Sequence, residues 1–179
     1  MISNTIVINL FGGPGISKST SSAKLFYELK TRHYNVELTN EYAKSLVYEE
    51  SFKKIKNQLY LFAKQHNQIF RLNGVVDIII MDSPLILSSI YDVNQSVHLR
   101  NLILDEHNKL NNLNFLIERQ TEYKEEGRYH TLEEAKEVDV KIKTFLQTNN
   151  IEFIPVTISN IMEVVFSKLK SYEKFNQIN

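Results

Sequence analysis

The segment from residue 12 to residue 20 has the residue types and spacing best suited to chemistry in this chain. Its residues are Gly12, Gly13, Pro14, Gly15, Ile16, Ser17, Lys18, Ser19 and Thr20. Glycines let backbone amides turn inward around phosphate oxygens, and the start of a following helix adds partial positive charge. Lys18 is placed to reach the β- and γ-phosphates of a nucleotide, and the Ser19 hydroxyl to bind Mg²⁺. We therefore expect this segment, the phosphate loop, to bind ATP with Mg²⁺.

One position departs from the pattern G-x-x-x-x-G-K-[ST]. Ser17 stands where a glycine normally precedes the lysine. A side chain at this position is expected to crowd the phosphates or to strain the loop, which would weaken nucleotide binding or activity. The alternative interpretation is an ordinary glycine-rich turn between a strand and a helix. A dinucleotide-binding fingerprint is excluded because Lys18 occupies its third glycine position.

Two acidic residues follow predicted strands and are candidates for the same site. Asp82 follows the apolar run at residues 75–81, where a carboxylate can hold Mg²⁺ directly or through water. Glu41 follows the shorter predicted strand at residues 35–38 and would face a phosphoryl acceptor, whose hydroxyl it can orient or deprotonate. The alternatives are an aspartate that opens a turn and a glutamate in the first turn of a helix.

A polar and charged segment, residues 120–131, is expected to form a mobile surface loop. Arg119 and Arg128 bracket most of it. Guanidinium groups on a closing lid can neutralise the charge of a transferring phosphoryl group and help to exclude water. We expect a catalytic role for both arginines. The alternative, a charge run on a solvated face, applies to Lys124, Glu125 and Glu126.

The elements that must position these residues alternate between short β-branched runs and longer helical patterns. Strands are predicted at residues 5–11, 35–38, 75–81, 115–117 and 152–156. Helices are predicted at residues 21–32, 52–74, 95–107 and 160–172, and one more begins at Thr131, where Glu134 completes a capping box. Such alternation favours βαβ units and hence an α/β fold, with a parallel sheet covered by helices on both faces.

Length and composition narrow the class of protein. At 179 residues the chain has the size of one domain, and no repeat or linker divides it. Its 21 basic and 21 acidic side chains cancel, which argues against a protein that mainly coats nucleic acid or an anionic membrane. It has no cysteine, no signal-peptide pattern and no apolar stretch near the roughly 20 residues of a membrane helix. We therefore expect a cytoplasmic protein.

With these residues in view, the chain resembles the small P-loop kinases of the ribosylnicotinamide-kinase-like group, which are frequent in bacteriophages. The resemblance covers most of the chain. It rests on the phosphate loop, Glu41-Tyr42-Ala43, Asp82-Ser83-Pro84, Glu118-Arg119 through Glu126-Gly127-Arg128, and the helix that opens at Thr131 with Asp139 further along.

The resemblance implies a three-layer P-loop NTPase fold with a five-stranded parallel sheet and an arginine-bearing lid at about residues 119–131. It also implies transfer of the γ-phosphoryl group of ATP to a hydroxyl, with the turn at residues 156–159 near the adenine. The acceptor does not carry over, because members of the group differ in it. The leading hypothesis is a small nucleoside, ribosylnicotinamide or nucleoside monophosphate.

Two other functions stay open at this point. A kinase acting on polynucleotide ends or on modified bases in DNA would need a local basic groove. The candidate cations for such a groove are Arg32, Lys53, Lys54 and Lys56. A non-catalytic regulatory module that binds nucleotide would fit a phosphate loop weakened by Ser17. A guanine-nucleotide switch is disfavoured because the segment at residues 108–111 lacks the aspartate of N-K-x-D.

Overall fold

The protein is built on one five-stranded sheet. The computed structural model describes residues 4–120, 131–172 and 175. Its strands are β1 (Ile6–Phe11), β2 (Val36–Thr39), β3 (Ile78–Met81), β4 (Asn111–Ile117) and β5 (Ile154–Val156). They are hydrogen-bonded in the order β2-β3-β1-β4-β5, and every neighbouring pair is parallel. This confirms the predicted α/β fold and its five-stranded parallel sheet.

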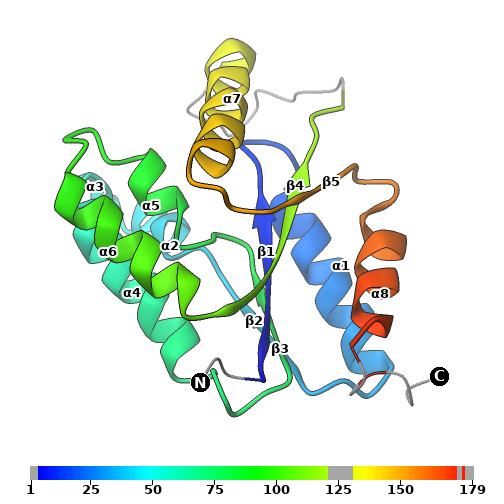
Figure 1. Ribbon diagram of the computed structural model, residues 1–179. Helices are drawn as coiled ribbons and strands as arrows, with labels where there is room; N and C mark the ends of the chain where they lie inside the picture. Colours follow the sequence, from blue (N-terminus) through cyan, green and yellow to red (C-terminus); the bar gives the residue numbers. More distant parts are fainter. Residues whose placement is uncertain (1–3, 121–130, 173–174, 176–179) are drawn as a thin grey trace.

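Helices cover both faces of the sheet and make three layers (Figure 1). One face is covered by α1 (Lys18–Thr31) and α8 (Ile161–Lys170). The helices of the other side are α2 (Tyr42–Tyr48), α3 (Phe52–Ile55), α4 (Gln58–Phe70), α5 (Leu87–Ile90), α6 (Val97–Asn108) and α7 (Leu132–Thr148). Figure 1 shows α7 above the carboxyl ends of the strands. No helix in the described part of the chain is long and apolar enough to cross a membrane.

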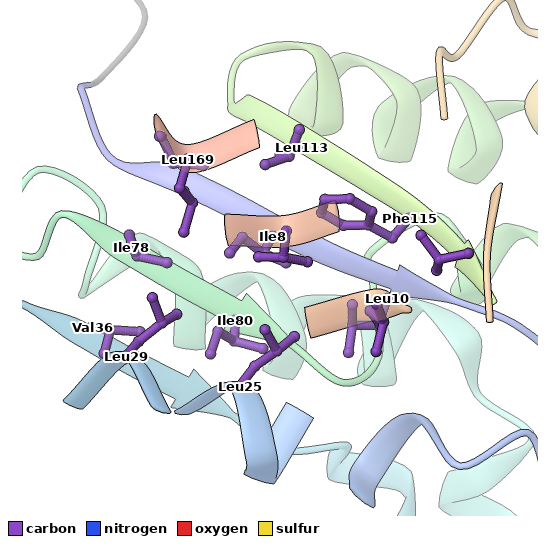
Figure 2. Close-up of a cluster of buried hydrophobic side chains, with 14 of the residues drawn as sticks. Ile8, Leu10, Leu25, Leu29, Val36, Ile78, Ile80, Leu113, Phe115 and Leu169 are labelled. Atoms are coloured by element: carbon purple, nitrogen blue, oxygen red, sulfur yellow. The ribbon is translucent and has the colours of Figure 1, made fainter. Parts of the chain in front are cut away.

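The core has two halves, one on each side of the sheet. Alternate β1 side chains enter them: Ile8 and Leu10 face one half, and Val7 faces the other. Figure 2 shows the first half, where Ile8 and Leu10 lie among side chains that include Leu25 and Leu29 of α1. Because β1 is buried on both faces, its sequence is almost continuously apolar, as a central parallel strand requires.

Several boundaries differ from the predicted ones. The helix predicted from residue 52 is two helices, because Asn57 interrupts it and caps α4 by accepting a hydrogen bond from the Tyr60 amide. The strand predicted at residues 75–81 begins only at Ile78, and Val75 is exposed to solvent. The helix at Thr131 starts as predicted, with both hydrogen bonds of the capping box formed.

Candidate active site

The phosphate loop connects the central strand β1 to α1. A parallel sheet places such a connection at the carboxyl edge, where nucleotides bind in open α/β folds. Gly12 turns at φ 153°, and a Cβ there would lie 2.6 Å from the Ile16 side chain. Gly15 turns at φ 77°, and Ile16 is buried beneath the loop. These positions require glycine for backbone reasons, which supports reading the segment as a built loop rather than an ordinary turn.

Ser17 adopts the left-handed conformation, with φ 64° and ψ 28°. This explains why the pattern has glycine at this position, since a residue with a Cβ is strained there by about 1–2 kcal/mol. The Ser17 side chain makes no capping hydrogen bond to α1 that would offset the strain. The backbone therefore agrees with the prediction that Ser17 strains the loop.

Lys18 is the first residue of α1, and its ammonium group folds back over the loop. It donates hydrogen bonds to the Gly12 carbonyl at 2.6 Å and to the Gly13 carbonyl at 2.9 Å. Burial lowers its pKa, while the negative charges of Glu41 and Asp82 act in the opposite direction. The structure thus brings together Lys18, Glu41 and Asp82, three predicted site residues that follow three different strands.

Ser19 and Asp82 are joined directly. The Ser19 hydroxyl donates to Oδ2 of Asp82 at 2.6 Å. Asp82 follows β3 and is 4% exposed, and its second oxygen, Oδ1, is buried with no hydrogen-bond partner among the described residues. A buried carboxylate oxygen left unpaired is costly unless a cation or water completes it.

This pair fits a Mg²⁺ site of the kind found beside phosphate loops. Magnesium usually binds to one or two protein oxygens and keeps water and phosphate oxygens for the rest of its shell. The serine hydroxyl and the unpaired carboxylate oxygen supply such ligands. Within the described ranges, no group of three or more His, Asp or Glu side chains forms a metal cage, so the nucleotide would have to complete the shell.

Glu41 precedes α2 at the carboxyl end of β2, as predicted. Burial raises the pKa of its carboxyl group and the neighbouring Asp82 raises it further, while the ammonium of Lys18 opposes both. A carboxylate with a raised pKa is a stronger base than an exposed one and is better suited to accept a proton near neutral pH.

Arg119 lies two residues beyond β4 and is turned toward the phosphate loop. Its Nε donates to Oδ2 of Asp139 at 2.6 Å, and a terminal guanidinium nitrogen donates to the Pro14 carbonyl at 2.8 Å. Arg119 therefore lies against the phosphate loop, and its catalytic role stays a prediction. Arg128, the other predicted lid arginine, lies outside the described residues, and its catalytic role stays a prediction.

Two residues of this region had no assigned role from the sequence. Asp139 of α7 accepts a hydrogen bond from the Gly13 amide at 2.6 Å in addition to its contact with Arg119. Tyr91 directly follows α5 and is half-buried; burial raises its pKa to about 12, and the charges of Glu41 and Asp139 add to the shift. The family resemblance includes Asp139 but gives it no role, and no local pattern marks Tyr91, since both reach the site through the packing of their helices.

The candidate DNA-binding cations do not form one groove. Arg32 follows α1, and its guanidinium lies over the Phe166 ring of α8 at 4.2 Å from the ring centroid. The three lysines belong to α3 and the residue after it, on the opposite side of the sheet (Figure 1). The prediction that these four residues form one basic groove is therefore wrong.

The fold and the loop together define a P-loop NTPase, with strand order 2-3-1-4-5 and the phosphate loop after the central strand. Comparison with protein families then identifies the family. An AAA domain family, AAA_28, matches residues 7–163, and the chain belongs to this family. No curated protein sequence matches the chain.

Solved structures with the same fold include deoxyadenosine kinase and NadR. A structure of deoxyadenosine kinase from M. mycoides with dCMP and dCDP has a TM-score of 0.60 and 22% identity, covering 93% of this chain and 100% of that one. NadR in complex with NR has a TM-score of 0.66 and 17% identity, covering 95% of this chain and 52% of NadR. NadR with NAD and AMP-PNP has a TM-score of 0.61 and 16% identity. The present chain spans about half the length of NadR. At these identities the likeness shows a shared fold.

Proposed function

We propose that the protein is an ATP-dependent phosphotransferase that moves the γ-phosphoryl group of ATP to a hydroxyl or phosphate of a nucleoside-like small molecule. The observation that carries the proposal is the Ser19–Asp82 hydrogen bond, with the buried second oxygen of Asp82 unpaired. Lys18 and Glu41 interact electrostatically with each other and with Asp82. A turn that only connected a strand to a helix would have no need of this cluster.

In the proposed reaction the protein positions groups rather than forming bonds to them. The loop amides and Lys18 bind the phosphates, for which Lys18 exchanges its two loop carbonyls for phosphate oxygens. Ser19 and Asp82 would hold Mg²⁺, which supplies charge neutralisation when it is bound. The turn at residues 156–159 is the proposed contact for adenine. Arg119, which donates to the Pro14 carbonyl of the loop, would add positive charge near the phosphates.

For a hydroxyl acceptor, the transfer step is a displacement at phosphorus. The acceptor oxygen forms a bond to the γ-phosphorus, and the bond from that phosphorus to the β,γ-bridging oxygen breaks, so that ADP leaves. The acceptor proton passes to the Glu41 carboxylate, whose raised pKa favours its acceptance. Tyr91, whose pKa is raised by burial and further by the negative charge of Glu41, is the proposed hydrogen-bonding contact to the acceptor.

The acceptor class is proposed from the ligands of solved structures that share the fold. Both named neighbours bind nucleosides or nucleotides, as their names and ligands state. We therefore propose a nucleoside, ribosylnicotinamide or nucleoside monophosphate as acceptor.

The test is incubation with Mg·ATP and a panel of these acceptors, followed by chromatography and phosphorus NMR of the products. We expect one phosphorylated acceptor and an equal amount of ADP. Lys18→Ala should abolish product formation, whereas Lys24→Ala, which removes an exposed lysine from the same helix, should not. Absence of a phosphorylated product from every acceptor would refute the transferase proposal.

A second candidate function is a nucleotide-binding regulatory module without turnover. The left-handed Ser17 favours it, because a strained loop can hold nucleotide in a geometry unsuited to transfer. Calorimetric binding of Mg·ATP together with no product in the acceptor panel would favour this function over the transferase.

A further inference from the structure

One carboxylate connects α7 to the phosphate loop. Asp139 accepts from the Gly13 amide through Oδ1 and from Arg119 Nε through Oδ2, both at 2.6 Å. Arg119 in turn donates to the carbonyl of Pro14 at 2.8 Å. The ion pair therefore holds the loop at two consecutive residues, once through an amide and once through a carbonyl.

This ion pair differs from the others on the same helix. The side chains of Arg119 and Asp139 are 13% and 23% exposed, whereas those of Lys136 and Glu133 are 52% and 78% exposed. Solvent-exposed pairs contribute little because water screens them, while short charge-assisted hydrogen bonds in a partly buried site are stronger. The burial indicates a contact that fixes geometry.

The packing between α7 and the loop leaves no room for a side chain. A Cβ at residue 13 would lie 2.6 Å from Oδ1 of Asp139 and 2.9 Å from the backbone carbonyl of Ala135. The second glycine of the loop is thus explained by α7, not by the nucleotide. It follows that a displacement of α7 is transmitted directly to the loop backbone.

Lys18 gives the ion pair its importance when nucleotide binds. In this structure Lys18 also holds the bend of the loop at residues 12–14, through the carbonyls of Gly12 and Gly13. Once its ammonium group moves to phosphate oxygens, those two hydrogen bonds are lost. The contacts from Asp139 and Arg119 then remain on the same stretch of backbone.

We propose that Asp139 is a positioning residue that acts with Arg119 to hold the bend at residues 12–14 in its nucleotide-binding shape and so couples α7 to the nucleotide site. This inference rests on the proposed function, since it takes the loop to bind a nucleotide. Asp139 itself reaches the nucleotide only through Gly13 and Arg119.

The test compares nucleotide affinity with the stability of the nucleotide-free protein. Asp139→Ala should weaken Mg·ATP binding about tenfold by calorimetry, because the bend loses its anchor when Lys18 leaves. The melting temperature without nucleotide should fall by only a few degrees, because Lys18 still holds the bend there. Hydrogen exchange of the Gly13 amide should accelerate in the same variant. Glu137→Gln, which removes an exposed carboxylate from the same helix, should change none of the three.

Three further variants decide whether the pair acts as one unit. Asp139→Asn keeps an oxygen for the Gly13 amide and should lose less affinity than Asp139→Ala; it also replaces that variant if the alanine protein does not fold. Arg119→Gln should weaken binding, and the double variant Asp139→Ala/Arg119→Gln should be no weaker than the worse single variant. If the losses of affinity in the two single variants add up in the double variant, Asp139 and Arg119 do not act as one unit and the proposal is wrong.

The outcomes separate this inference from the function on which it rests. If the parent binds Mg·ATP and Asp139→Ala binds it equally well, the inference is wrong and the proposed function stands. If the parent itself shows no binding of Mg·ATP, both are wrong.

Discussion

Two polar clusters lie in the interior of this protein, and they are built on opposite rules. The first cluster, called here the asparagine cluster, consists of Asn9 on β1 and of Asn112 and Asn114 on β4. The Asn9 amide nitrogen donates to both of the other side-chain oxygens, at 2.8 and 2.9 Å. The amide nitrogens of Asn112 and Asn114 donate to the backbone carbonyls of His107 and Glu152. All three amide nitrogens of this cluster therefore have hydrogen-bond acceptors inside the protein.

The second cluster lies at the carboxyl end of the sheet and is incomplete. Asp82 has a buried oxygen without a partner among the described residues, Ser17 is strained, and Lys18 is engaged with its own loop. The comparison teaches that burial of polar groups alone does not indicate function. What distinguishes the candidate site is the unfinished hydrogen bonding, because that is what a ligand can complete.

The largest effect that would test this contrast is expected at Asp82. Asp82→Asn should lower the transfer rate about a hundred- to a thousandfold, because a charged Mg²⁺ ligand is lost. The free energy of unfolding should stay within about 1 kcal/mol or rise, since the variant removes a buried charge and still accepts from Ser19. Initial rates and urea titration measure the two quantities. A large loss of stability would show that this cluster is structural as well.

The asparagine cluster should respond in the reverse way. Asn9→Leu removes the nitrogen that pairs the side-chain oxygens of Asn112 and Asn114, the second of them buried, and we expect about 3 kcal/mol less stability. The rate per folded molecule should stay within about twofold of the parent. Urea unfolding and an active-site titration test this, with Asn101→Ala on the exposed side of α6 as the control. Loss of activity in the folded variant would show that the asparagine cluster also contributes to the reaction, contrary to this expectation.

His107, whose backbone carbonyl accepts from Asn112, makes the stability of the protein sensitive to acid through its imidazole. Its imidazole is buried, and burial lowers its pKa from 6.5 to about 4. Between these two pH values the His107 imidazole is protonated in the unfolded chain and neutral in the folded protein. The free energy of unfolding therefore rises with pH across this window. From above pH 6.5 to below pH 4 the loss from this group should reach about 3 kcal/mol.

The measurement is urea unfolding as a function of pH. His107→Phe should flatten the profile in that window, whereas His98→Gln, at an exposed position of the same helix, should leave the slope unchanged. An unaltered slope in His107→Phe would contradict the expectation.

The smallest effect is expected from relieving strain at the loop. Ser17→Gly should stabilise the protein by up to about 1 kcal/mol, because glycine adopts φ 64° without steric cost. Mg·ATP binding should tighten by about two- to fivefold, since less strain opposes the bound loop. Calorimetry and urea unfolding measure both. Unchanged affinity would mean that the loop already tolerates the serine.

Much of the fold could be predicted because its signals are local. The β1 run, the loop glycines and the Thr131 capping box each lie within a few residues of sequence. The early part of β4 was missed, since Asn111 to Asn114 is mostly asparagine, and the side chains of Asn112 and Asn114 find their partner in Asn9 on the neighbouring strand. For the same reason the sequence gives no role to Asp139 and does not mark Tyr91. Their positions depend on contacts with residues tens of positions away, which no local pattern contains.

The place of β1 in the sheet has a consequence for how the chain is made. Ile6 pairs with Ile78 on one side and with Asn111 on the other. On a ribosome that adds about 5–20 residues per second, β1 therefore waits several seconds before its second neighbour has been synthesised. Until β3 has been synthesised this apolar segment has both edges unpaired, and one edge stays unpaired until β4 follows, so it is a segment that a chaperone or an aggregating partner would meet early.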